Sequence, residues 1–198
     1  MTTAVSRKAS HSMALVALFA ALMAVMGLIP KIDLPMGVPI TLQSLGVMLA
    51  GCLLGARRGL QAMLLFLAAV AAGLPLLAGG RGGLGVFMVP SAGYLVGYAL
   101  AAGVTGALMR VLPHGTPRRT ALSAFIASLL GGLVFLHAMG IAGLMLLAQM
   151  PLDKAIMIDL AFVPGDLAKC VLCALVVHTV ARALPDWPFG GRERGVKV

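Results

Sequence analysis

Asp166 and Lys169 are two ionisable residues that stand three positions apart at the start of an otherwise apolar stretch. Residues at this spacing share one face of a helix, and ionisable groups inside a membrane helix usually mark the site or path of a ligand or ion. The ammonium group could attract the carboxylate of a ligand. The alternative is an ion pair that only neutralises its own two charges, and the spacing alone leaves both interpretations open.

Further polar residues stand at the starts of other apolar stretches or in the segments beside them. They are Thr41, Gln43 and Ser44 in one group, Ser91 and Tyr94 in a second, and Arg81 in the glycine-rich segment 79–85. Polar groups at membrane depth are tolerated where they line a protein cavity, so we expect one polar pocket on a single side of the membrane. For each residue alone, a helix cap or an interhelical hydrogen bond is as good an explanation as ligand contact. The glycine-rich segment is either a flexible connection or a loop that folds over a ligand.

The sequence contains no combination of residues that is typical of catalysis. A nucleophile with its base, a cluster of metal ligands and a phosphate-binding Walker loop are all missing. We therefore expect no enzymatic activity, no metal, no cofactor and no hydrolysis of ATP by this chain.

Cys52, Cys170 and Cys173 lie in apolar runs, where a thiol usually behaves as a small buried hydrophobic group. His137 and His178 also lie in apolar runs, and we expect packed histidines there.

The elements that position these residues are predicted to be membrane-spanning helices. Of the 198 residues 61% are hydrophobic and 11% are charged, and a helix needs about 20 apolar residues to cross the hydrocarbon layer. We predict an all-α integral membrane protein, a single domain of residues 1–198 with six transmembrane helices. Their approximate ranges are 12–29, 41–55, 59–74, 90–110, 120–149 and 165–184. We expect an interfacial helical turn within 151–163, and a basic tail, 185–198, that is disordered or rests on lipid headgroups.

The distribution of basic residues predicts the orientation of the helices. Eleven of the fifteen Lys and Arg residues fall in alternate connections and at the two chain ends. Loops rich in Lys and Arg remain in the cytoplasm, so both termini are predicted to be cytoplasmic and the pocket to open outward. The net charge of +9 would suggest a nucleic-acid partner for a soluble chain, but here the charges indicate membrane topology.

The first apolar stretch carries small residues in two staggered rows, Ala17 with Ala21 and Ala20 with Ala24. Small residues at this spacing let another helix approach closely in a membrane. Because alanine is common in membrane helices, the meaning of these rows depends on what the rest of the chain resembles.

Several short motifs together resemble the BioY family, the biotin-specific substrate-capture subunits (S components) of energy-coupling factor (ECF) transporters. They are residues 39–43 (PITLQ), 49–51 (LAG), 55–59 (GARRG), 73–75 (GLP), 79–85 (GGRGGLG), Pro90 with 93–95 (GYL), and 164–166 (PGD) with Lys169. The order and spacing of these motifs carry the resemblance, which extends from the first predicted helix to the last. One departure is residues 89–93 (VPSAG), where the family more often has GPTGG, and the bulkier residues alter the contour of the pocket.

The resemblance implies a multi-pass protein of the bacterial inner membrane whose outward-facing cavity binds biotin as substrate, with no cofactor and no nucleic acid. Carried over by position, it implies biotin-binding roles for Thr41, Gln43, Arg81, Tyr94, Asp166 and Lys169. Of these, Asp166 and Lys169 are expected near the carboxylate of biotin. It also implies that the alanine rows (Ala17, Ala20, Ala21 and Ala24) dock a transmembrane coupling subunit, the T component, which a pair of ABC-type ATPases drives.

Two other functions remain as alternatives. An S component for a flat aromatic vitamin such as thiamine or riboflavin would favour several aromatic residues in the pocket. The chain is only 5% aromatic, and its one Trp, Trp187, lies in the predicted tail. A membrane enzyme would need a catalytic set, and a channel would need polar residues through the full depth of several helices. An aliphatic ligand with a carboxylate fits the sequence better than either alternative.

Overall fold

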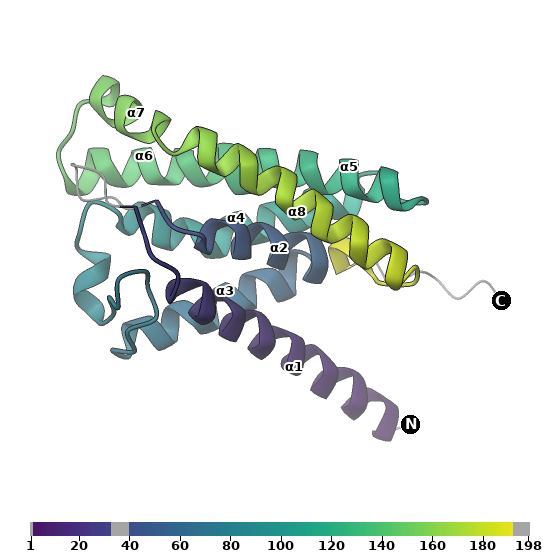
Figure 1. The fold of residues 1–198 in the computed structure, drawn as a ribbon. Helices are drawn as coiled ribbons and strands as arrows, with labels where there is room; N and C mark the ends of the chain where they lie inside the picture. Colours follow the sequence, from purple (N-terminus) through teal and green to yellow (C-terminus); the bar gives the residue numbers. More distant parts are fainter. Residues whose placement is uncertain (1, 33–39, 192–198) are drawn as a thin grey trace.

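The computed structural model describes residues 2–32 and 40–191, and over this part the chain is a bundle of helices without a β-sheet (Figure 1). The α-helices are α1 (Thr2–Gly27), α2 (Gln43–Leu54), α3 (Ala56–Ala71), α4 (Ala92–Val111), α5 (Pro117–Ala127), α6 (Leu136–Leu147), α7 (Leu152–Leu160) and α8 (Val163–Ala183). Two 3-10 helices, η1 (Leu84–Phe87) and η3 (Phe189–Gly191), and a π-helical stretch, η2 (Ser128–Phe135), complete the described elements. Because α5, η2 and α6 follow without a break, they form one long helix.

Within residues 2–32 and 40–191, four helical segments are long and apolar enough to cross a membrane. They are Ser10–Gly27, Ala92–Val111, Pro117–Leu147 and Val163–Ala183. The chain is therefore an all-α, multi-pass membrane protein. The helices α2 and α3, with 12 and 16 residues, are shorter than the roughly 20 residues of a straight crossing.

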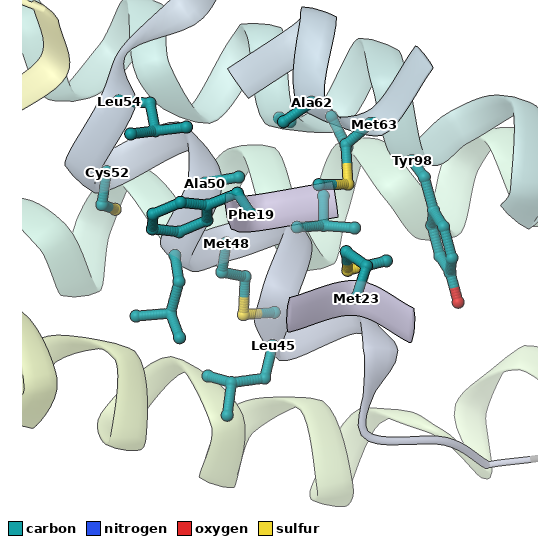
Figure 2. Close-up of a cluster of buried hydrophobic side chains, with 14 of the residues drawn as sticks. Phe19, Met23, Leu45, Met48, Ala50, Cys52, Leu54, Ala62, Met63 and Tyr98 are labelled. Carbon is teal, nitrogen blue, oxygen red and sulfur yellow. The ribbon is translucent and has the colours of Figure 1, made fainter. Parts of the chain in front are cut away.

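The short helix α2 lies at the centre of the bundle. All of its residues are buried, and it packs against α1, α3, α4 and α8. Figure 2 shows part of this core, in which Met23 of α1, Met48 of α2 and Met63 of α3 lie close together. Protein, and not lipid, surrounds α2, so its polar first turn can face a cavity inside the bundle.

Local sequence explains where the long helix begins. Thr116 precedes it in an extended conformation and accepts a hydrogen bond from the backbone N–H of Arg119 at 3.3 Å. Pro117 occupies the first turn, where the missing N–H of proline has no cost. At the other end of this helix, the predicted interfacial turn of 151–163 is the nine-residue helix α7, which follows Pro151.

The bundle has two ends, which we call the α7 end and the terminal end (Figure 1). At the α7 end, α2, α4 and α8 begin and α1, α3 and α6 finish. At the terminal end, α1 begins, α8 finishes and η3 lies. The two ends of the described chain therefore lie on one side of the bundle.

Residues 185–191 of the predicted tail are not disordered. Trp187 donates a hydrogen bond from Nε1 to the carbonyl oxygen of Leu53 at 2.9 Å, and Phe189 is buried and stacks on His114. Burial of two aromatic side chains stabilises this segment against the bundle, whatever its basic and glycine-rich composition suggests. Residues 192–198 of the predicted tail lie outside the described residues.

A close backbone approach fixes the same segment in place. Gly55, between α2 and α3, has a φ of 83°, a conformation that favours glycine. A Cβ atom at Gly55 would collide with the backbone of Gly190. Residues 185–191, which we call the C-terminal clasp, thus pack under the α2–α3 turn.

The helix α1 lies at the edge of the bundle, where it packs against α2 and α3. It exposes apolar side chains, including Leu18 and Val25. An apolar face of this kind suits lipid or another membrane helix.

Candidate ligand-binding site

A cavity of about 60 Å³ lies at the α7 end, among the first turns of α2, α4 and α8. Its lining residues are Thr41, Gln43, Ser44, Leu77, Arg81, Ser91, Tyr94, Leu95, Tyr98, Leu136, Phe162, Asp166 and Lys169. All six residues that the sequence predicts as ligand contacts are among them. The structure therefore brings together residues that lie up to 128 positions apart.

Lys169 uses all of its hydrogen-bond donors on neighbouring protein groups. Its Nζ lies 2.5 Å from Asp166 Oδ1, 2.6 Å from the carbonyl oxygen of Thr41 and 2.9 Å from Ser44 Oγ. An ammonium group has three donors, so each has one acceptor. Asp166 and Lys169 therefore form an ion pair, and Lys169 also joins α8 to the start of α2.

The side chain of Gln43 joins two other parts of the chain. It is 1% exposed, and its Nε2 donates to the carbonyl oxygens of Met23 and Leu76, both at 3.1 Å. Both amide hydrogens are thus used by the backbone of α1 and of the segment after α3. The carbonyl oxygen of the Gln43 side chain is the part that can serve a ligand in the cavity.

The segment after α3 folds over the cavity. Leu77 is 1% exposed, and its backbone N–H donates to the carbonyl oxygen of Arg81 at 3.0 Å. This turn directs both residues to the cavity wall, where Arg81 is partly buried and its Nε donates to the carbonyl oxygen of Ala78 at 3.4 Å. The Leu77–Arg81 pairing therefore makes the start of the glycine-rich segment an ordered turn beside the cavity.

Ser91 lines the same cavity with a hydroxyl group that has no partner among the described residues. The residue is buried, and its Oγ forms no hydrogen bond with residues 2–32 or 40–191. A buried polar atom without a partner costs about 1–3 kcal/mol. This hydroxyl is therefore suited to a polar group that enters the cavity.

Tyr94 reaches across the cavity to α7. Its hydroxyl donates to Asp159 Oδ1 at 2.7 Å, and its ring packs on Phe162 with ring centroids 5.8 Å apart. A Cβ atom at Gly140 on α6 would collide with the Tyr94 ring. The glycine thus leaves the space that Tyr94 occupies.

His137 and Asp159 are polar residues of this site that sequence reasoning missed. His137 lies 2.8 Å from Asp159 Oδ2 through Nδ1 and 2.9 Å from Asp166 Oδ2 through Nε2. All three residues are buried. The prediction of a packed histidine describes the burial of His137 but not its two carboxylate partners, which stand 22 and 29 positions away along the chain. Residues so far apart along the chain form no short motif, so the sequence alone does not predict these two contacts.

The structure separates the two alanine rows of α1. Ala17 and Ala21 are exposed, whereas Ala20 is buried and Ala24 is partly buried. Ala17 and Ala21 are therefore the row that another helix could reach.

Buried polar groups that converge on a cavity inside an apolar helical bundle are typical of a membrane-embedded binding protein. Comparison with known proteins is more specific. The sequence profile of the BioY family matches residues 1–186, and the chain belongs to the BioY family. The family resemblance predicted from the sequence motifs is thus confirmed.

Two relatives are similar over nearly the whole chain. The chain is 48% identical to "Biotin transporter BioY" of Rhodobacter capsulatus over 187 residues, which cover 89% of this chain and 96% of the relative. It is 47% identical to "Biotin transporter BioY" of Rhizobium etli over 182 residues, which cover 90% of this chain and 97% of the relative. Both relatives are named as transporters, and neither as an enzyme.

A solved structure has the same fold. It is the crystal structure of "the S-component for biotin from an ECF-type ABC transporter", with a TM-score of 0.81 and 29% sequence identity. The match covers 89% of this chain and 93% of the solved chain. The arrangement of helices described above is therefore the S-component fold.

Proposed function

We propose that this chain is the biotin-binding S component of an ECF-type vitamin transporter. The observation that carries the proposal is the cavity of the α7 end, in which charged and polar side chains from α2, α4 and α8 converge inside an apolar bundle. Relatives named as biotin transporters, with nearly half of their residues identical, support biotin as the ligand.

Biotin offers a carboxylate on an aliphatic chain and a ureido ring with two N–H donors and a carbonyl acceptor. In the proposed complex the carboxylate accepts from Lys169, where it replaces Ser44 or Thr41 as acceptor. Gln43 can accept from the ureido ring, and Arg81 and Tyr94, which also line the cavity, can meet the other polar atoms. The unpartnered hydroxyl of Ser91 adds a further donor and acceptor.

Binding requires the walls of the cavity to move apart. The cavity of about 60 Å³ is smaller than the roughly 300–1,000 Å³ of most small-molecule sites. Its walls include the folded loop with Leu77 and Arg81 on one side and Phe162, next to α7, on another. These segments are the ones that we expect to separate when biotin enters.

The proposed orientation places the α7 end outside and the terminal end in the cytoplasm. Arg57 and Arg58 at the start of α3, Arg110 near the end of α4, and Arg182 near the end of α8 all belong to the terminal end. Basic residues favour the cytoplasmic side, which supports cytoplasmic termini; the proposal includes six spans in a bacterial inner membrane. In this arrangement the cavity opens outward, as capture requires.

We further propose that α1 docks the transmembrane coupling subunit through Ala17 and Ala21, which are exposed, while partner ATPases supply the energy. Ala17→Leu and Ala21→Leu should block copurification with the coupling subunit, because a larger side chain prevents close helix approach. Ala142→Leu, at another exposed alanine on α6, is the matched control. Equal copurification of all three variants would contradict docking through this row.

The test of ligand identity is calorimetric titration of biotin into the purified protein in detergent, after removal of carried ligand. One-to-one binding of biotin, without binding of thiamine or riboflavin, is the expected result. A folded protein that ignores biotin and binds another vitamin would overturn the proposal while the S-component fold stands.

A further inference from the structure

His137 occupies a position that the binding of a carboxylate ligand does not by itself require. It lies on α6 directly after the π-helical stretch η2, and only 5% of its surface is exposed. Each of its two ring nitrogens contacts a different carboxylate, Asp159 on α7 and Asp166 on α8. The imidazole therefore joins three helices at one point.

These two contacts require one more proton than the separate groups would hold in water. An ionised carboxylate only accepts hydrogen bonds, and a neutral imidazole donates from only one of its nitrogens. A second proton must therefore lie either on the ring or on one of the two carboxyl groups. The bridge of Asp159, His137 and Asp166 accordingly carries a shared proton.

With that proton the charges of the buried cluster cancel. Lys169 and the shared proton supply two positive charges, and the carboxylates of Asp159 and Asp166 supply two negative charges. Tyr94 from α4 contributes a neutral hydroxyl to Asp159. A neutral cluster is the form that a low-dielectric interior favours, because an unpaired buried charge is strongly destabilising.

The bridge also determines where α7 lies. Asp159 is the buried polar residue of this nine-residue helix, and it bonds to both His137 and Tyr94. Phe162, which follows α7, lines the cavity. Any displacement of Asp159 would therefore move a wall of the cavity, and any displacement of His137 would remove a donor from Asp166.

We infer that His137 is a positioning residue of the binding site, which holds Asp166 and the helix α7 in place through one proton shared with two carboxylates. This inference rests on the proposed function, since it concerns the same site. His137 does not line the cavity itself, so it acts on the ligand through Asp166 and α7.

The test compares biotin binding by the full-length wild type with His137→Asn, Asp159→Asn and the double variant, by calorimetry at pH 8. His137→Asn leaves two carboxylates beside one cation, and we expect affinity to fall by at least about tenfold. Asp159→Asn keeps the cluster neutral and should have a smaller effect. The double variant is neutral again and should return to within about threefold of Asp159→Asn.

A purely steric role for His137 predicts a different pattern. In that case the double variant binds biotin no better than His137→Asn, and this result would overturn the inference. If His137→Asn fails to fold while the double variant folds and binds, the recovery itself supports the charge role. Failure of both, with a folded Asp159→Asn protein, would count against it.

A pH series adds a readout that loss of packing would not change. Deprotonation of the bridge leaves two carboxylates against Lys169, so wild-type affinity should fall at alkaline pH more steeply than that of the double variant. Tyr94, Arg81 and Lys169 face the site in both proteins and cancel in the comparison. Parallel pH profiles would overturn the inference.

The two proposals fail in distinguishable ways. A wild-type protein that does not bind biotin removes the proposed ligand, whatever the variants do. The melting temperatures of the same four proteins then test the bridge without a ligand, with the same expected recovery in the double variant. If wild type binds biotin and no recovery occurs, the ligand stands and the role of His137 falls.

Discussion

The α7 end and the terminal end of the bundle are held together by different kinds of contact. At the α7 end, Asp166 lies within hydrogen-bond distance of both Lys169 and His137, and the three ionisable side chains are buried or partly buried. At the terminal end, Trp187 and Phe189 of the C-terminal clasp bury aromatic rings, and Gly190 packs directly on the backbone near Gly55. The central helix α2 begins at the first set of contacts and finishes at the second.

The difference indicates a division of roles. Charged groups at the α7 end depend on one another, so a ligand that replaces one partner affects the whole cluster. Close packing at the terminal end depends on shape and is insensitive to charge. We therefore expect changes at the α7 end to alter ligand binding, and changes at the terminal end to alter stability alone.

The largest hollows of the bundle do not lie at the end that we propose as the binding site. Three hollows of about 440, 610 and 560 Å³ lie at the terminal end, around the C-terminal clasp, whereas the cavity at the α7 end measures about 60 Å³. The larger hollows lie beside basic residues, among them the exposed Arg57. Converging buried polar groups, and not volume, identify the binding site.

Asp166→Ala should have the largest effect, because it removes the carboxylate that both Lys169 and His137 contact. Loss of one partner from a buried charge cluster costs about 3–5 kcal/mol. Thermal unfolding in detergent should show a large decrease in melting temperature, together with loss of biotin binding. Asp153→Ala, at an exposed position on α7, is the matched control, and equal behaviour of the two variants would remove Asp166 from the centre of the cluster.

Lys169→Ala should distinguish a carboxylate contact from general disruption. We expect biotin to lose about 2–5 kcal/mol of binding free energy, and the amide analogue of biotin to lose clearly less. Calorimetry of both ligands measures the difference, and Lys154→Ala, exposed on α7, serves as control. Equal losses for biotin and its amide would exclude Lys169 as the carboxylate partner.

Gly55→Ala should break the terminal end without affecting the ligand. Its positive φ and the collision with Gly190 lead us to expect a loss of about 2 kcal/mol of unfolding free energy. Gly73→Ala is the control, because Gly73 also has a positive φ, of 101°, but has nothing within 4 Å of a Cβ atom. An equal decrease in melting temperature for both variants would show that the clasp contact contributes nothing.

Trp187→Phe should have the smallest effect of the four. It removes the hydrogen bond from Nε1 to Leu53 but keeps an aromatic ring, so we expect a loss of about 1 kcal/mol of stability. The affinity for biotin should not change. A clear decrease in biotin affinity, measured by the same titration, would mean that the two ends of the bundle are coupled.

The sequence predicts the polar residues that line the cavity, but not the contacts of His137 with Asp159 and Asp166. The starts of α2, α4 and α8 were predictable because polar residues interrupt apolar runs there, as at Gln43 and Asp166. His137 and Asp159 were missed because their contact depends on how α7 folds back over α6, which no local pattern encodes. The C-terminal clasp was missed for a related reason. A basic, glycine-rich composition predicts a disordered tail or one that rests on lipid headgroups. Instead, the aromatic rings of Trp187 and Phe189 pack on the bundle, and Gly55 allows the backbone of Gly190 to approach closely.

Hydrogen–deuterium exchange with and without biotin tests most directly whether the α7 end is the binding site. We predict that biotin slows exchange in peptides that cover residues 40–48, 76–98 and 155–170, which include every lining residue of the cavity except Leu136. Peptides 108–120 and 183–191, at the terminal end, should exchange at the same rate in both states. Slower exchange confined to those terminal peptides, around the larger hollows, would contradict the assignment of the site.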